Sequence, residues 1–186
     1  MAAAINVLGF SGSLRKASFN AAVLRAAVEL APPDVTIETF DLRGIPLYDG
    51  DVEAAGLPAA VVRFRERIAA ADALLIVTPE YNYSMAGVLK NAIDWASRPP
   101  DQPFRGKPVA IAGASMGGFG TARAQYHLRQ TCVFLDMLPL NKPEVFVSTA
   151  HQKVDAGGRL TDEPSRTALR ALLEALAAWT RRLRPS

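Results

Sequence analysis

Short apolar runs alternate along the chain with longer segments in which apolar residues recur every three or four positions. The runs predict five strands and the periodic segments predict helices. The expected strands are residues 5–10, 35–40, 73–77, 108–114 and 144–148. The expected helices are residues 21–30, 59–71, 87–96, 121–136 and a last helix that Thr161 or Asp162 caps, with Pro164 in its first turn. Residues 41–58, with three glycines and two prolines, are expected to form a loop.

Strands that alternate with helices predict a parallel sheet covered on both faces, which is a doubly wound α/β fold. No internal repeat or linker divides the sequence, so residues 1–186 are expected to form a single domain. Ligands of such sheets bind beyond the carboxyl ends of the strands, where the strand order reverses. The loops after the first, third and fourth expected strands are therefore the candidate sites.

The first of these loops, residues 11–20, reads Ser-Gly-Ser-Leu-Arg-Lys-Ala-Ser-Phe-Asn and opens a helix. Free backbone amides and the helix dipole favour an anion there. Ser11, Ser13 and Ser18 add hydroxyl donors. Asn20 adds an amide, and Arg15 adds a planar charged fork suited to phosphate oxygens. The alternative is an ordinary turn in which Ser18 caps the helix and Arg15 faces solvent; no Walker A or dinucleotide fingerprint is present.

The second loop, residues 78–87, reads Thr-Pro-Glu-Tyr-Asn-Tyr-Ser-Met-Ala-Gly and directly follows a buried strand. The aromatic faces of Tyr81 and Tyr83 and the nearby backbone amides suit a flat ring with polar edges. Equally, the tyrosines could simply cover the end of the sheet. Ser84 is expected to cap the helix that follows.

The third loop, residues 113–121, has three glycines within four positions, Gly117, Gly118 and Gly120. Such a backbone can approach a ligand closely or adopt a positive φ. The alternative is a glycine-rich connection that binds nothing.

At these loops the sequence resembles the NADPH-dependent FMN reductase family, which includes bacterial quinone reductases, chromate reductases and some azoreductases. The matching segments are residues 12–20, 79–84, 89–95 and 117–118, in the family's order over nearly the whole chain. The resemblance implies a flavodoxin-like fold with strand order 2-1-3-4-5, FMN as cofactor, and NADPH or NADH as hydride donor. One departure is Ala86, where relatives commonly carry proline.

The resemblance also implies which residues surround each part of the FMN. Those expected at the phosphate are Ser13, Arg15, Ser18 and Asn20. Those expected along the isoalloxazine edge are Pro79, Glu80, Tyr81 and Asn82, largely through backbone groups, with Ser115 and Gly117 bordering the ring from the third loop. The other cofactor-binding candidates are Ser11, Phe19, Tyr83 and Gly118.

The implied activity is electron transfer from NAD(P)H, by a ping-pong mechanism, to quinones or similar small acceptors such as flavins, azo compounds or chromate. The flavin N5 would carry the chemistry, so no catalytic side chain is expected. One alternative is a flavodoxin-type electron carrier that does not oxidise NAD(P)H; such carriers are usually strongly acidic, whereas this chain has a net charge of +3. Another is a cofactor-free binding or regulatory domain.

The family resemblance also implies a homodimer or homotetramer. Arg123 and Tyr126, three residues apart, share one helix face. With Tyr83 and Glu144 they could form a polar cluster between subunits. The alternative is that this face is solvated.

Composition excludes several other classes. No apolar stretch approaches the roughly 18 residues of a membrane span, and the N-terminal residues lack the basic region of a signal peptide. The expected location is the cytoplasm, with no membrane or nucleic-acid partner. His127 and His151 lack neighbouring acidic ligands, so no metal site is expected. Cys132 is expected to be a small core residue rather than a nucleophile.

Overall fold

The computed structural model describes residues 4–184, and its centre is a parallel sheet in the order β2-β1-β3-β6-β7, with β8 also paired to β6. The strands are β1 (Ile5–Ser11), β2 (Val35–Phe40), β3 (Ala73–Val77), β6 (Pro108–Ala114), β7 (Leu138–Pro139) and β8 (Val145–Val147). The predicted parallel, doubly wound order is confirmed. Residues 1–3, within the stretch expected to lack a signal peptide, lie outside the described residues.

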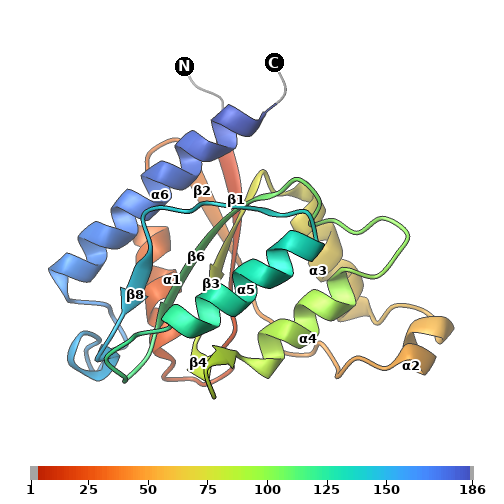
Figure 1. Ribbon diagram of the computed structural model, residues 1–186, viewed down its shortest axis with the longest axis horizontal. Helices are drawn as coiled ribbons and strands as arrows, with labels where there is room; N and C mark the ends of the chain where they lie inside the picture. Colours follow the sequence, from red (N-terminus) through yellow and green to blue (C-terminus); the bar gives the residue numbers. More distant parts are fainter. Residues whose placement is uncertain (1–3, 185–186) are drawn as a thin grey trace.

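Helices cover both faces of the sheet (Figure 1). One face carries α1 (Phe19–Glu29) and α6 (Glu163–Leu183), and the other carries α3 (Ala59–Ala70), α4 (Gly87–Ala96) and α5 (Ala122–Phe134). Alternate residues of β3 enter the two apolar clusters: Leu75 packs with α1 and α6, and Leu74 with α3 and α4. Burial on both faces explains why β3 is a continuous apolar run rather than an alternating one.

The predicted fifth strand is confirmed as β8, but the prediction missed β7, a second short strand that shares its position beside β6. β7 pairs with the first half of β6, and β8 pairs with its second half. Pro139 and Pro143 have no N–H to donate, and the chain leaves the sheet between the two strands. The short 3-10 helix η1 (Ala150–Gln152) follows β8.

The predicted loop over residues 41–58 is also wrong in part, because it contains the helix α2 (Gly50–Ala55). The carboxylate of Asp49 caps this helix by accepting a hydrogen bond from the amide of Asp51 at 2.8 Å. The loop is attached to α4 through Pro46, whose carbonyl accepts hydrogen bonds from Asn91 and Trp95.

An antiparallel hairpin that the sequence analysis did not anticipate links β3 to α4. Its strands are β4 (Glu80–Tyr81) and β5 (Ser84–Met85). The expected cap is therefore wrong: Ser84 belongs to β5 and its hydroxyl lies 3.0 Å from Nδ1 of His127, while Ala86 takes the N-cap position of α4. Ala86 has a φ of −62°, so the backbone adopts the angle that a proline would impose, although no proline is present there.

Other expectations concern single residues and helix ends. Asp162 caps α6, as one of the two predicted candidates. Near the end of α6, Arg181 pairs with Asp34 and Arg184 pairs with Asp72. Cys132 is buried, and burial raises the pKa of its thiol to about 12, so it is a core residue and not a nucleophile.

Two searches of residues 4–184 bear on membranes and metals. They contain no helix long and apolar enough to cross a membrane. They also contain no group of three His, Cys, Asp or Glu side chains arranged to hold a metal ion. The cytoplasmic location stays a prediction.

Candidate functional site

The loops that follow β1, β3 and β6 meet at the end of the sheet opposite the start of β1 and the carboxyl end of α6 (Figure 1). There they enclose a pocket of about 560 Å³, within the roughly 300–1,000 Å³ typical of small-molecule sites. Every predicted cofactor-binding residue except Ser11 and Gly118 lines this pocket. Ser11 instead lines a neighbouring groove, and its Oγ accepts a hydrogen bond from the amide of Ser13 at 3.2 Å.

The start of α1 forms one end of the pocket. Ser18 is its N-cap, and Ser18 Oγ accepts a hydrogen bond from the amide of Ala21 at 3.2 Å. The first intrahelical hydrogen bond joins the amide of Ala22 to the carbonyl of Ser18, so the amides of Phe19 and Asn20 precede it. Ser18 caps the helix with its oxygen and keeps its O–H as a donor. This end of the pocket is therefore suited to an anion.

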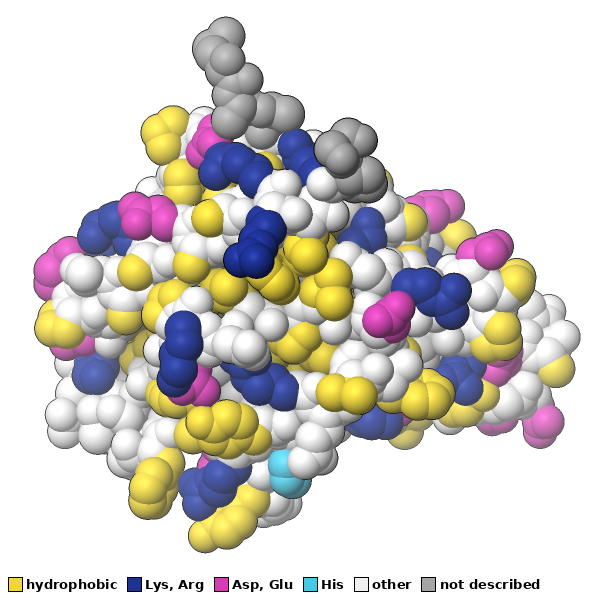
Figure 2. Space-filling model, turned by 45° about the horizontal axis from the view of Figure 1, so that its top comes forward, with side chains coloured by type: hydrophobic (Ala, Val, Ile, Leu, Met, Phe, Trp, Pro, Cys, Tyr) yellow, Lys and Arg dark blue, Asp and Glu magenta, His cyan; other side chains and the backbone are white. Residues whose placement is uncertain are grey.

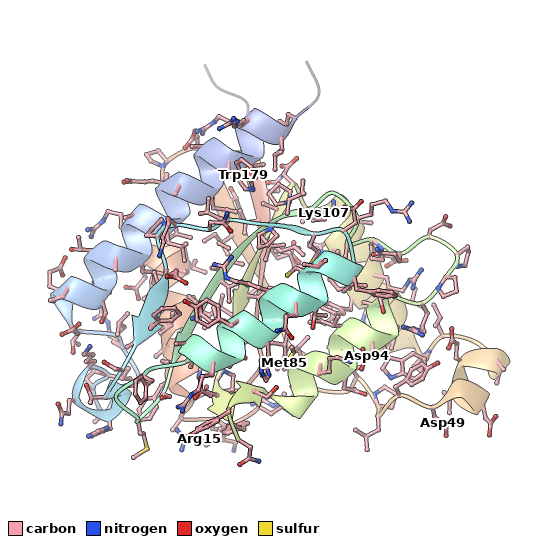
Figure 3. The ribbon with its side chains drawn as sticks, viewed as in Figure 1. Arg15, Asp49, Met85, Asp94, Lys107 and Trp179 are labelled. Atoms are coloured by element: carbon pink, nitrogen blue, oxygen red, sulfur yellow. The ribbon has the colours of Figure 1, made fainter. Side chains whose placement is uncertain are left out.

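Arg15 supplies a positive charge at the same end of the pocket. One of its guanidinium nitrogens, Nη2, donates to the carbonyl of Ala17 at 2.9 Å, and the group lies 5.3 Å from the ring centroid of Phe19. These contacts orient the side chain, and a guanidinium has further N–H groups for phosphate oxygens. Figure 3 locates Arg15 at the end of the molecule opposite Lys107 and Trp179.

Asn20 joins the first loop to the third. Its side-chain amide donates to the carbonyl of Ala114 at 2.9 Å and its oxygen accepts from the amide of Ala114 at 2.8 Å. Asn20 is only 3% exposed, so both bonds are buried. Its side chain therefore positions the end of β6, and its backbone amide is one of the N–H groups at the helix start that precede the first intrahelical hydrogen bond.

The β4–β5 hairpin forms the other end of the pocket. Its two turn residues, Asn82 and Tyr83, have φ angles of 50° and 64°. Asparagine suits this left-handed conformation, but a bulky tyrosine adopts it only at a cost. Arg123 compensates by stacking its guanidinium 3.7 Å from the ring centroid of Tyr83.

Glu80 fastens this hairpin to α5. Its carboxylate accepts hydrogen bonds from the amides of Arg123 (3.0 Å) and Ala124 (3.1 Å) and from Nε of Arg123 (2.6 Å). The side chain is 6% exposed and turns toward the helix, so Glu80 caps α5 in place of Thr121, which makes no side-chain capping bond.

The third loop is held by its own hydrogen bonds. Ser115 Oγ donates to the carbonyl of Gly120 at 2.6 Å and accepts from the amide of Gly117 at 3.1 Å. Gly120 has a φ of 59° and lies against Phe146, so a Cβ there would contact the Phe146 backbone at 3.1 Å. This glycine serves the turn itself, and Ser115 and Gly117 line the pocket.

Three lining residues, Ala114, Met116 and Arg123, were not among the predicted cofactor-binding residues. Ala114 is the last residue of β6. Met116 is 61% exposed and lies in the third loop between Ser115 and Gly117, two predicted residues. That position between them was the sequence signal that could have identified Met116 as a lining residue. Arg123 was expected only at an interface. Its place at the pocket depends on the ion pair with Glu80, which is 43 residues away in the chain.

The residues predicted to form a polar cluster between subunits form two separate pairs within the chain. Tyr83 stacks on Arg123, and the hydroxyl of Tyr126 donates to Glu144 at 3.1 Å. The pKa of Glu144 is lowered, mainly because Lys142 donates a hydrogen bond to its carboxylate.

The molecular face that carries α5 is shown in Figure 2. Hydrophobic side chains gather on it, with basic side chains among them.

The fold and the pocket define a flavodoxin-like α/β protein with a pocket, suited at one end to an anion, at the switch point of its sheet. A family model described as NADPH-dependent FMN reductase matches residues 5–152. The chain belongs to this family.

Individual relatives support the same family membership. The chain is 66% identical over 180 residues to an NAD(P)H-dependent FMN reductase of Pseudomonas aeruginosa, with 97% of each chain covered. It is 46% identical over 187 residues to a quinone reductase of Escherichia coli, covering 99% of this chain and all of the relative. Among solved structures, the flavoenzyme FerB of Paracoccus denitrificans, an NAD(P)H:(acceptor) oxidoreductase, has a TM-score of 0.86 at 34% identity, with 96% and 98% coverage.

Proposed function

We propose that this protein is an NAD(P)H-dependent reductase that holds one FMN per chain and passes electrons to quinones or similar small acceptors by a ping-pong mechanism. The observation that carries the proposal is the pocket. It joins an anion-binding helix start to a hairpin lined by tyrosines, within one flavodoxin-like domain. The family to which the chain belongs supports both the cofactor and the hydride donor.

The residues present fit FMN by the chemistry of their donors. Arg15, the hydroxyls of Ser13 and Ser18, and the amides that open α1 would hold the phosphate. The backbone of residues 79–83, with Ser115 and Gly117, would border the ring edge. FMN, when bound, supplies the hydride-transfer chemistry. Among the described residues, Glu80 is the one carboxylate that lines the pocket, and its oxygens accept hydrogen bonds from α5, so we assign no catalytic side chain.

The acceptor class follows from the side chains at the hairpin and the third loop. Tyr81, Tyr83 and Met116 are all more than half exposed, and they line the pocket with apolar surface. A flat, weakly polar acceptor such as a quinone matches that surface. NAD(P)H and the acceptor would use this same open side in turn, which is the condition for ping-pong kinetics. A flavodoxin-type carrier would lack steady NAD(P)H oxidation.

We also infer a homodimer or homotetramer in which Tyr83, Arg123, Tyr126 and Glu144 lie at an interface. Tyr83, Tyr126 and Phe119 are 66%, 51% and 72% exposed, and together they form a large exposed aromatic area around the start of α5. Light scattering at micromolar concentration should give a mass of two or four chains. A mass equal to one chain would contradict the inference.

The binding of FMN is tested at Arg15. The Arg15→Ala variant should fold normally, because the side chain is exposed and contributes little to the core. Its affinity for FMN should fall by about ten- to a hundredfold, since a hydrogen bond to a charged group contributes roughly 1.5–3 kcal/mol. Fluorescence titration of the cofactor-free protein measures this loss.

Riboflavin, which has no phosphate, provides the control for that experiment. Its affinity should change much less in Arg15→Ala, because the lost interaction is electrostatic. Arg15→Lys should recover only part of the FMN affinity, since a point charge cannot reproduce the planar fork. If Arg15→Ala binds FMN as tightly as the parent protein, Arg15 is a solvent-exposed residue and the phosphate assignment is wrong.

A further inference from the structure

A second groove, of about 270 Å³, lies beside the first loop, and we call it the basic groove. It lies between the carboxyl ends of β1 and β2 and the first turns of α1. Its charged lining residues are Arg15, Lys16, Arg25, Arg43 and Asp41. Four basic side chains face one carboxylate, a difference of three positive charges, which equals the net charge of the whole chain. Such a concentration of charge attracts anionic ligands.

Neutral backbone groups hold two of these arginines in place. Arg25 donates from Nη2 to the carbonyl of Gly158 at 2.7 Å, and Arg43 donates from Nη2 to the carbonyl of Leu14 at 2.7 Å. Arg43 is also paired with Asp41 at 2.9 Å. A carbonyl orients a guanidinium without neutralising it, so Arg25 keeps its charge, and both arginines keep further N–H donors for a ligand.

The position of the basic groove indicates which anion it takes. Ser13 and Arg15 line both this groove and the main pocket, so the two cavities adjoin at the first loop. Asp41 directly follows β2, and Arg43 comes two residues later. A coenzyme that occupies the main pocket can therefore place a second phosphate in the basic groove, among the charges of Lys16, Arg25 and Arg43.

We propose that the basic groove binds the adenosine 2′-phosphate of NADPH, with Lys16 and Arg25 as the residues that discriminate NADPH from NADH. This inference rests on the proposed function and adds to it the choice of coenzyme. Arg15 is assigned to the FMN phosphate, so Lys16, Arg25 and Arg43 against Asp41 leave two positive charges for a second ligand. A phosphate monoester carries about −1.5 to −2 charges at pH 7, which matches that balance. NADH presents an uncharged hydroxyl at the same place and gains nothing from these cations.

Isothermal titration of the FMN-loaded protein with adenosine 2′,5′-bisphosphate tests the groove without any turnover, with 5′-AMP as the comparison ligand. The bisphosphate should bind at least about tenfold more tightly than 5′-AMP, since one more charge-assisted contact is gained. Lys16→Ala and Arg25→Ala should each lower the affinity for the bisphosphate by roughly tenfold and leave the affinity for 5′-AMP almost unchanged. Both residues line the basic groove and not the main pocket, so the FMN content should be retained.

Arg63→Ala is the matched control, because Arg63 is an exposed helical arginine on α3, on the other face of the sheet. It should leave both affinities unchanged. Lys16 is also exposed, so its variant tests the groove even if Arg25→Ala disturbs the contact with Gly158. Equal binding of the two ligands, or equal weakening of both by the variants, would make the groove a general phosphate site and overturn the assignment.

Steady-state kinetics separate this inference from the proposed function. In Lys16→Ala and Arg25→Ala the KM for NADPH should rise about tenfold, with kcat and the KM for NADH little changed. If the parent protein oxidises neither coenzyme, the proposed function fails, while the titration still reports on the groove. If the parent oxidises both coenzymes and the variants leave the ratio of the two KM values unchanged, only the groove assignment fails.

Discussion

Replacing Asn20 by alanine is expected to lower the free energy of unfolding by about 2–4 kcal/mol. The Asn20 side chain makes both a donor and an acceptor bond to the backbone of Ala114, and both residues are almost fully buried. In the variant the amide and the carbonyl of Ala114 both lose a partner inside the protein, and each such loss costs roughly 1–3 kcal/mol. Urea denaturation followed by circular dichroism measures the change.

Asn141→Ala is the control for this variant, because Asn141 is exposed and its replacement should change stability by no more than about 0.5 kcal/mol. Asn20→Asp should not restore stability, since a carboxylate oxygen would then face the carbonyl of Ala114. FMN affinity should fall along with stability, because Asn20 ties the start of α1 to the loop that contains Ser115. A loss of stability no larger than that of Asn141→Ala would show that these bonds contribute little.

Replacing Glu80 by alanine is the second large expected effect, again about 2–4 kcal/mol of unfolding free energy. A lost helix cap costs roughly 1–2 kcal/mol, and hydrogen bonds to a charged group contribute about 1.5–3 kcal/mol. The variant loses both at once, because Glu80 caps α5 and pairs with Arg123. Arg123 is also released from its fixed position over Tyr83, so the hairpin that borders the pocket loses its attachment.

Thermal and urea denaturation of Glu80→Ala, with Glu66→Ala as the control, test this result. Glu66 is an exposed carboxylate on α3, so its removal should have little effect. Glu80→Gln should recover part of the stability, because the amide oxygen can still accept from the helix but the negative charge is gone. If Glu80→Ala is as stable as Glu66→Ala, the carboxylate neither caps α5 nor holds the hairpin.

The order of elements and the location of the candidate site could be predicted from sequence because they depend on local patterns. The apolar run of β3 indicated a strand buried on both faces, and the helical periods marked the helices on either side. The rule that ligands bind at the carboxyl ends of parallel strands then selected the three loops that line the pocket. The family resemblance added the cofactor and the coenzyme, which periodicity cannot supply.

Only the tertiary structure decided which partner each side chain of the site takes. The side chain of Asn20 bonds to Ala114, which is 94 residues away, and that of Glu80 bonds to α5, whereas the family resemblance implied a phosphate and a ring edge as their neighbours. The basic groove likewise combines residues of two strand ends and a helix. The physical reason is that periodicity specifies which face of an element is buried, whereas a polar group forms its hydrogen bonds with whatever the finished packing brings within about 3 Å.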